Sequence, residues 1–433
     1  MIRSICAMSA LLLACSAPDG GDPDADLDDA STADVSTTTD AGTPDAASEA
    51  DADAAPQIKY VMVIVKENHT FDNYFSGFPG AESATSAKLS NGTTKKLTVA
   101  PNGDLAGDTC HANSCGFKAY DNGAMDGFDT NGNTTQPFMH YTETQIPNYW
   151  QLAKNFVLAD HFFSTTLGPS TPGHAVFWNA RSLSLDNADC PTGGDCGGFG
   201  CIAGKDTTIT SYNQDDCTTK TVYPCFDVPT LVDHLPKGFT WMDYGGAIAL
   251  MTKSVVGMPN YQSHFKSGAN LLIDLENKKI SNLTIAHLSA GAASEHPPNA
   301  PCAGENETIS IINAAMALPE WKEMAIVVTW DDWGGWYDHV APTVKKCKNG
   351  KIFNTGFRLP AIIVSPYAKQ GYVLKTHAEQ ASVPRLVEEL WNMEFMTKRD
   401  PHARDGTAGS LLGAFDFSQA PRAPMPLKTH TCP

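Results

Sequence analysis

The sequence predicts an α/β fold in which a central, largely parallel β-sheet is flanked by helices. Two observations lead to this class. Apolar runs of strand length recur along the chain, and helix-like stretches lie between them. The apolar runs are continuous rather than alternating, which is typical of strands buried on both faces. A length of 433 residues allows such a domain, with loop insertions and an ample core.

The elements follow one another in a βα order. The strands that we expect are 60–65 (YVMVIV), 239–244 (FTWMDY), 283–288 (LTIAHL), 325–330 (AIVVTW) and 360–365 (PAIIVS). The helices that we expect are 146–163, 307–321 and 381–395. No internal repeat of solenoid type is visible, so these elements are expected to form one sheet.

The first 15 residues, MIRSICAMSALLLAC, have the layout of an export signal: a positive charge at Arg3, a short apolar stretch and small residues before Cys15. The ending LLAC is similar to a bacterial lipobox, in which the Cys carries lipid. The interpretation that we favour is a lipoprotein of the bacterial cell envelope, attached to a membrane through a lipidated Cys15. The alternative is an ordinary cleaved signal and a secreted protein, with Cys15 incidental.

Residues 16–57 are expected to form a disordered tether. They contain eleven Asp, one Glu, no Lys or Arg and no aromatic residue, so they cannot bury enough apolar area to fold. This segment carries −12 of the total charge of −18, and with Arg3 at +1 the residues 58–433 carry only −7. A mildly acidic body lacks the basic face that a nucleic-acid-binding protein needs, so nucleic acid is excluded as a partner.

The cysteine content also indicates export. Ten cysteines follow the signal segment, an even number that allows up to five disulfides, although the sequence does not give the pairing. A cluster in a Gly- and Asp-rich stretch is expected to close a disulfide-rich insertion at about 185–230, and a zinc site is the less favoured alternative because no His stands at ligand spacing. The ten are Cys110, Cys115, Cys190, Cys196, Cys201, Cys217, Cys225, Cys302, Cys347 and Cys432.

Acidic and amide side chains follow two of the expected strands. Glu67 and Asn68 come directly after strand 60–65, and Asp331 and Asp332 come directly after strand 325–330. In open α/β sheets, ligands bind beyond the carboxyl ends of the strands. These oxygen-bearing side chains therefore predict a site for a hard divalent cation, and solvated turn residues remain the alternative on the pattern alone.

A nucleophile candidate and three histidines complete the set of chemically capable residues. In LGPSTPGH (167–174) prolines on both sides of Ser170 would present its hydroxyl rigidly at a loop-to-helix junction. The alternative is that Ser170 or Thr171 is a helix N-cap. His111, His296 and His339 stand in polar segments, and each of them alone fits a structural role as well as a catalytic one.

Several motifs in a fixed order resemble the bacterial phosphoesterase family. That family groups the non-haemolytic phospholipases C with certain acid phosphatases, inside the alkaline-phosphatase-like superfamily. The resemblance spans about residues 58–395. It is carried by KENHTFDNYF (66–75), MDGF (125–128), GPSTPGH (168–174), SEHPP (294–298), TWDDWGGWYDHVAP (329–342) and GFRLPAIIVSPYAKQG (356–371).

The resemblance implies a role for each candidate residue. One metal ion would be bound by Glu67, Asn68, Asp331 and Asp332. The nucleophile would be Ser170, and the phosphoryl group would be surrounded by His111, His296 and His339. Hard oxygen ligands suit Ca²⁺, Mg²⁺ or Mn²⁺ better than Zn²⁺.

Three positions depart from the family pattern. Gly173 stands where relatives usually have Asn. The Asp-His-Thr-Ser stretch of relatives is replaced by residues 379–382 (EQAS), which puts Gln380 in place of the family His, with His377 nearby. Asp332 stands where many phospholipase-like members have Glu, which resembles the acid-phosphatase branch.

The resemblance implies that residues 58–433 form an alkaline-phosphatase-like catalytic domain. We expect a metal-dependent hydrolase of phosphoric esters, either a phospholipase C-like phosphodiesterase or an acid phosphatase, with a covalent phosphoseryl intermediate and a phosphate ester or phospholipid as substrate. The alternative is a surface lipoprotein that keeps the fold only for binding.

Overall fold

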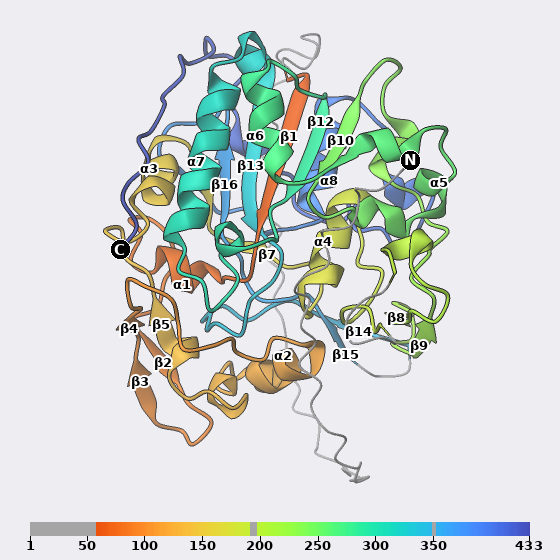
Figure 1. Cartoon of the computed structure of the whole chain (residues 1–433). Helices are drawn as coiled ribbons and strands as arrows, with labels where there is room; N and C mark the ends of the chain where they lie inside the picture. Colours follow the sequence, from red (N-terminus) through yellow and green to blue (C-terminus); the bar gives the residue numbers. More distant parts are fainter. Residues whose placement is uncertain (1–57, 191–196, 349–351) are drawn as a thin grey trace, which may run out of the picture.

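An eight-stranded sheet forms the centre of the molecule (Figure 1), in the order β11-β10-β12-β1-β13-β16-β6-β17. The computed structural model describes residues 58–190, 197–348 and 352–433. The strands of this sheet are β1 (Tyr60–Lys66), β6 (Val157–Ala159), β10 (Trp241–Tyr244), β11 (Phe265–Lys266), β12 (Leu283–His287), β13 (Met324–Trp330), β16 (Ala361–Val364) and β17 (Tyr372–Leu374).

The sheet confirms the α/β class and the five strands expected from the apolar runs. Strands β11, β10, β12, β1 and β13 all pair in parallel. Strand β16 is antiparallel to both of its neighbours, so of the strands described in this sheet it alone runs in the opposite direction. The central strands β1, β12 and β13 are almost completely buried, as continuous apolar runs predict.

Helices cover the sheet on both sides (Figure 1). In that view α6 (Ala269–Glu276) and α7 (Cys302–Met316) lie side by side in front of the sheet, and α8 (Ser382–Leu390) lies behind it. Two further helices are α3 (Pro147–Asn155), which packs against β6, β16 and β17, and α4 (Ser170–Asn179), which packs against α8. The short helices are α1 (Phe71–Phe75), α2 (Asn113–Tyr120) and α5 (Lys253–Val256).

Small two-stranded sheets lie outside the central sheet. They are β2 (Ser86–Lys88) with β3 (Thr94–Lys96), β4 (Thr98–Val99) with β5 (Met139–His140), β7 (Phe162–Phe163) with β18 (Ala378–Glu379), β8 (Ile209–Tyr212) with β9 (Thr219–Val222), and β14 (Val344–Lys346) with β15 (Ile352–Asn354). Between α4 and β10 the described chain forms the β8–β9 hairpin and short turns, which is the region expected to be an insertion.

The helix predicted over 146–163 is wrong in its second half. Helix α3 ends at Asn155, and the chain continues as β6 and β7. Residues 157–159 pair with β16 on one side and β17 on the other. The apolar run VLADHFF is therefore buried by strand pairing, which an apolar run of this length does not distinguish from a helix. The other two helices are found, displaced by a few residues at their ends.

Disulfides join the loops, as the cysteine count predicts. They are Cys110–Cys115, Cys201–Cys225, Cys217–Cys347 and Cys302–Cys432, and Cys190 is also disulfide-bonded. Because the sulfurs of Cys201, Cys217 and Cys225 are used in this way, they are not thiolate ligands of a zinc ion.

The signal segment and the tether expected over residues 1–57 lie outside the described residues, as does Cys196. Within the part of the chain that the structure describes, no helix has both the length and the apolar character needed to cross a bilayer.

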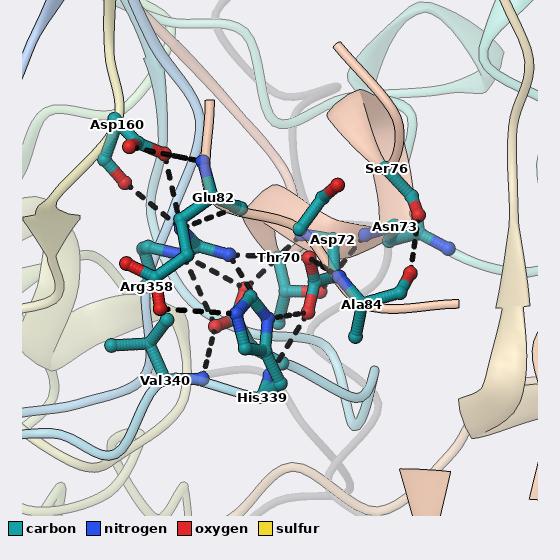
Figure 2. Close-up of polar contacts among 12 residues, drawn as sticks. Thr70, Asp72, Asn73, Ser76, Glu82, Ala84, Asp160, His339, Val340 and Arg358 are labelled. Carbon is teal, nitrogen blue, oxygen red and sulfur yellow. Dashed lines mark hydrogen bonds and ion pairs between the residues drawn. The ribbon is translucent and has the colours of Figure 1, made fainter. Parts of the chain in front are cut away.

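A buried arginine ties together three loops that leave the sheet (Figure 2). The Arg358 guanidinium, fully buried, lies 3.1 Å from Asp72 Oδ1, 3.1 Å from Asp338 Oδ1 and 3.2 Å from Asp160 Oδ1. These aspartates follow β1, β13 and β6 respectively. His339 joins the cluster through its Nδ1 atom, 2.6 Å from Asp72 Oδ2. The Arg358 cluster therefore holds in place the loops that begin with the acids after β1 and β13.

We predict that Arg358→Met lowers the free energy of unfolding by about 3–5 kcal/mol, because it removes the guanidinium that three buried carboxylates share. Arg399→Met is the matched control, since Arg399 forms an exposed ion pair with Glu394 at 3.7 Å, and such pairs contribute about 1 kcal/mol or less. Urea denaturation of both variants measures the difference. Equal small losses in the two variants would show that the Arg358 cluster does not hold the fold together.

Candidate active site

The pairing of β1 with β13 brings four of the predicted residues together. In the parallel register Lys66 lies opposite Trp330, and the Asp331 amide donates to the Lys66 carbonyl oxygen at 3.0 Å. The next residues of the two strands are therefore neighbours. The backbone N–H of Asn68 donates to Asp331 Oδ1 at 3.0 Å. The acids that follow the two strands therefore form one cluster.

Ser170 reaches this cluster from the first turn of α4. The preceding proline, Pro169, is extended, and the helix begins at Ser170 itself. The Ser170 hydroxyl lies 3.2 Å from Asp332 Oδ2 and 3.4 Å from Glu67 Oε2. Because the amides of a helix N-terminus point outward and carry partial positive charge, a phosphoryl group beside Ser170 would be favoured there. The structure thus joins the predicted nucleophile to the predicted ligands.

The acids of the cluster are buried and repel one another. Asp331 and Asp332 are completely buried, and Glu67 is 3% exposed. Burial and the charge of Glu67 raise the pKa of Asp331 to about 6. Burial and the charge of Asp331 raise the pKa of Asp332 well above its usual value. A divalent cation would offset this repulsion, and the same carboxylates would bind it.

The Asn68 side-chain amide lies between the acids and two histidines. Its Nδ2 atom lies 3.1 Å from His111 Nε2, and its oxygen faces the acids. A half-turn of the amide would instead let Nδ2 donate to Asp331 Oδ1 at 2.9 Å and to Glu67 Oε2 at 3.2 Å. The orientation with Nδ2 toward the acids satisfies both ends of the amide in the metal-free protein, and beside a cation the oxygen would face the acids instead. The donor set fits a hard divalent ion, with oxygens from Glu67, Asn68, Ser170, Asp331 and Asp332.

Two of the three predicted histidines lie on the other side of Asn68. His111 Nδ1 is bonded to the Thr109 carbonyl oxygen at 2.8 Å and His296 Nδ1 to the Pro297 carbonyl oxygen at 2.6 Å, so both rings turn their Nε2 atoms toward the Asn68 amide. Burial opposes a charge on His296, but the nearby Glu67 and other acidic groups raise its pKa. His111 is partly exposed, which makes this the open side of the site.

His339 lies elsewhere. Its ring pairs with Asp72 and faces Glu82, 3.4 Å from Nε2, within the Arg358 cluster (Figure 2). One oxygen of the buried Asp72 carboxylate, Oδ1, accepts from Arg358, and the other, Oδ2, is bonded to the His339 ring. The described contacts of His339 thus connect it to the Arg358 cluster and not to Ser170.

The departures from the family pattern have structural explanations. The Gln380 side chain is buried and donates from Nε2 to the Asp331 carbonyl oxygen at 2.5 Å, so it holds the backbone of a predicted ligand in place. A Cβ atom at Gly173 would overlap the same carbonyl oxygen, so glycine lets α4 pack directly on this strand end. His377 packs its ring on Phe163 at 4.7 Å.

His174 is a site residue that the sequence reasoning missed. Its Nε2 atom lies 3.1 Å from Glu67 Oε1 and 3.3 Å from Asp331 Oδ2. Burial disfavours a charge on this ring, but the hydrogen bond to Glu67 and the charges of both acids raise its pKa. The signal was available, because His174 is the last residue of GPSTPGH and stands four positions after Ser170, on the same helix face.

Glu295 was also missed, although it belongs to SEHPP. Its buried carboxylate accepts hydrogen bonds from Tyr74 Oη at 2.8 Å, Tyr149 Oη at 2.5 Å and Trp330 Nε1 at 3.2 Å. These three donors fix the residue directly before His296, so Glu295 anchors the loop that carries that ring.

The sequence is similar to those of known phosphoesterases. The model of the phosphoesterase family matches residues 58–394. Non-specific phospholipase C1 of Arabidopsis thaliana is 25% identical over 423 residues, covering 86% of this chain and 73% of that protein. Phospholipase C B of Mycobacterium tuberculosis is 22% identical, covering 86% and 80%. Non-hemolytic phospholipase C of Pseudomonas aeruginosa is 23% identical, covering 85% and 58%.

Solved structures were compared as well. A crystal structure of a protein in the alkaline phosphatase superfamily from Vibrio parahaemolyticus superposes with a TM-score of 0.36 and 11% identity, covering 79% of this chain and 68% of that one. The family match extends over both strand ends that carry the acids and over α4, and it includes every residue of the cluster. The chain belongs to the phosphoesterase family, a family of hydrolases that act on phosphoric ester bonds.

Proposed function

We propose that this protein is a metal-dependent phosphoric ester hydrolase in which Ser170 forms a covalent phosphoseryl intermediate. The observation that carries the proposal is the position of the Ser170 hydroxyl, at a helix N-terminus and in contact with Glu67 and Asp332.

The cation would be held by the oxygens of Glu67, Asn68, Asp331 and Asp332. When bound, a divalent ion lowers the pKa of a neighbouring hydroxyl and neutralises charge on phosphoryl oxygens. The hard oxygen set favours Ca²⁺, Mg²⁺ or Mn²⁺.

The chain's own residues account for the remaining steps. Ser170 Oγ forms a bond to phosphorus while the bond from phosphorus to the alcohol oxygen breaks, and the Ser170 proton passes to Asp332, its hydrogen-bond partner. His296 gives a proton from Nε2 to the departing alcohol oxygen. In the second half-reaction His296 takes a proton from water, the water oxygen bonds to phosphorus, and Ser170 leaves and recovers its proton from Asp332.

The substrate class is proposed from two observations. Relatives named phospholipases C favour a phosphodiester of phospholipid type. The Asp331-Asp332 pair resembles the acid-phosphatase branch and favours a monoester. Hydrolysis of p-nitrophenyl phosphorylcholine compared with p-nitrophenyl phosphate distinguishes the two. The complete set of buried site residues supports an enzyme over a protein that only binds phosphate esters.

Export and anchoring are also proposals. The disulfides of the described loops support an oxidising compartment. The sequence LLAC followed by the acidic segment 16–57 supports attachment through a lipidated Cys15, with residues 58–433 as the catalytic domain.

The nucleophile is tested by replacing it. Ser170→Ala should lower turnover at least about 10³-fold with little change in melting temperature, because the missing oxygen forms the intermediate rather than a packing contact. Thr171→Ala, one residue along the same buried turn, is the control and should be mild. Acid quenching of wild-type enzyme with substrate, followed by mass spectrometry, should find phosphate on Ser170. Phosphate on a histidine, or an active Ser170→Ala enzyme, would refute the assignment.

The metal is tested at two acids. Asp331→Asn and Glu67→Gln should each lose most of the bound cation and most of the activity while the fold persists, because neutralising one acid also relieves repulsion in the metal-free cluster. Asp400→Asn is the control, since Asp400 is also buried but pairs with Arg181 at 2.7 Å. Elemental analysis and calorimetric titration measure the loss. Wild-type metal content in both site variants would contradict the proposed ligands.

The anchor is tested by fractionation. Wild-type protein should partition into detergent, and Cys15→Ser should release it into the aqueous phase or leave its signal segment uncleaved. Cys6→Ser, in the same segment, should change neither property. Aqueous wild-type protein whose N-terminus is not Cys15 would show that the signal is of the ordinary cleaved kind.

A further inference from the structure

Three buried rings form a chain that ends on the acids of the site. Trp178 and His174 lie on the same face of α4, eight and four residues after Ser170, and His287 is the last residue of β12. Trp178 Nε1 donates to His287 Nε2 at 3.2 Å, and His287 Nδ1 lies 2.9 Å from His174 Nδ1. His174 Nε2 then lies 3.1 Å from Glu67 Oε1.

The hydrogens in this chain are placed by the indole. A tryptophan N–H can only donate, so His287 Nε2 must carry a lone pair. An imidazole carries at least one hydrogen, so the hydrogen of His287 is on Nδ1. That hydrogen points at His174 Nδ1, which must therefore accept. The His174 hydrogen is left on Nε2, facing the acids.

One acid competes with the indole for His287. Asp243 Oδ2 is buried and lies 4.0 Å from His287 Nε2. This distance is too long for a hydrogen bond, whereas the indole nitrogen is at 3.2 Å. A second proton on His174 would have to sit on Nδ1, opposite the Nδ1–H of His287. The indole therefore decides the direction of the whole chain, and it acts at Nδ1 against the charge on His174 that Glu67 and Asp331 favour from the other side of the ring.

We propose that Trp178 and His287 fix the tautomer of His174, so that its Nε2–H holds Glu67 and Asp331 and His174 is a positioning residue rather than a ligand of the cation. The alternative is that His174 binds the cation itself, because Glu67, His174 and Asp331 lie close enough together to share a metal ion. A His174 ring that binds the cation would need an Nε2 atom without a hydrogen, whereas these hydrogen bonds place the hydrogen on Nε2. The statement that His174 does not bind the cation rests on the proposed function. The tautomer of His174 is also a property of the metal-free protein.

The first experiment reads the tautomers directly. Two-bond ¹H–¹⁵N spectra of histidine-labelled protein, without metal and saturated with Ca²⁺, should show His287 protonated at Nδ1 and His174 protonated at Nε2 in both states. His174→Gln and His287→Phe assign the signals. A bare Nε2 on His174 in the Ca²⁺-saturated protein would overturn the proposal and make His174 a ligand. If Ca²⁺, Mg²⁺ and Mn²⁺ all fail to bind, the proposed function fails, while the tautomers of the metal-free protein still decide this inference.

The second experiment removes the indole donor. Trp178→Phe should give His287 and His174 mixed tautomers and weaken Ca²⁺ binding about tenfold in calorimetric titration, in line with losses of outer hydrogen bonds at metal sites. Trp391→Phe is the matched control, because Trp391 Nε1 donates to the Ile58 carbonyl oxygen at 3.1 Å, and it should leave the histidine spectra and the affinity unchanged. Wild-type spectra and affinity in Trp178→Phe would overturn the proposal.

Discussion

The site depends on the parallel pairing of β1 with β13. Because Lys66 lies opposite Trp330, the chain positions that follow are forced together, and these positions hold Glu67 and Asp331. A shift of one residue in this register would turn every side chain of the strand to the other face of the sheet. The apolar residues that bury both strands therefore also specify where the acids meet, and β12, on the other side of β1, brings His287 to the same end.

Contacts around the buried acids offset part of the unfavourable free energy of their mutual repulsion. The Arg358 cluster fixes the loops after β1 and β13 a few residues beyond the acids. Gln380 and Gly173 let α4 and the segment before α8 pack on the Asp331 backbone. His174 contacts the carboxylates themselves. These contacts leave part of the repulsion uncompensated, because the pKa values of Asp331 and Asp332 are still raised. A cation would neutralise the remaining charge.

The strand ends were predictable because a continuous apolar run followed by acids is a local signal. Ser170 required the family resemblance, since the pattern alone also fits an N-cap. The partners of His174 were beyond the sequence, because Trp178 and His287 meet only when α4 packs on β12. His339 follows the acids closely in the chain, yet its ring is captured by Asp72, a contact between distant segments. The reversal of β16 and the strand at 157–159 likewise depend on pairing partners.

Anomalous diffraction from crystals grown with Mn²⁺ tests most directly whether the two strand ends and α4 build one cation site. We expect one strong peak, within about 2.0–2.4 Å of oxygens from Glu67, Asn68, Asp331 and Asp332, with Ser170 beside it. The absence of a peak there would contradict it. So would a peak found instead among Asp72, Asp338 and His339, or among Asp108, His111 and His296, the other groups of described residues close enough to hold a metal.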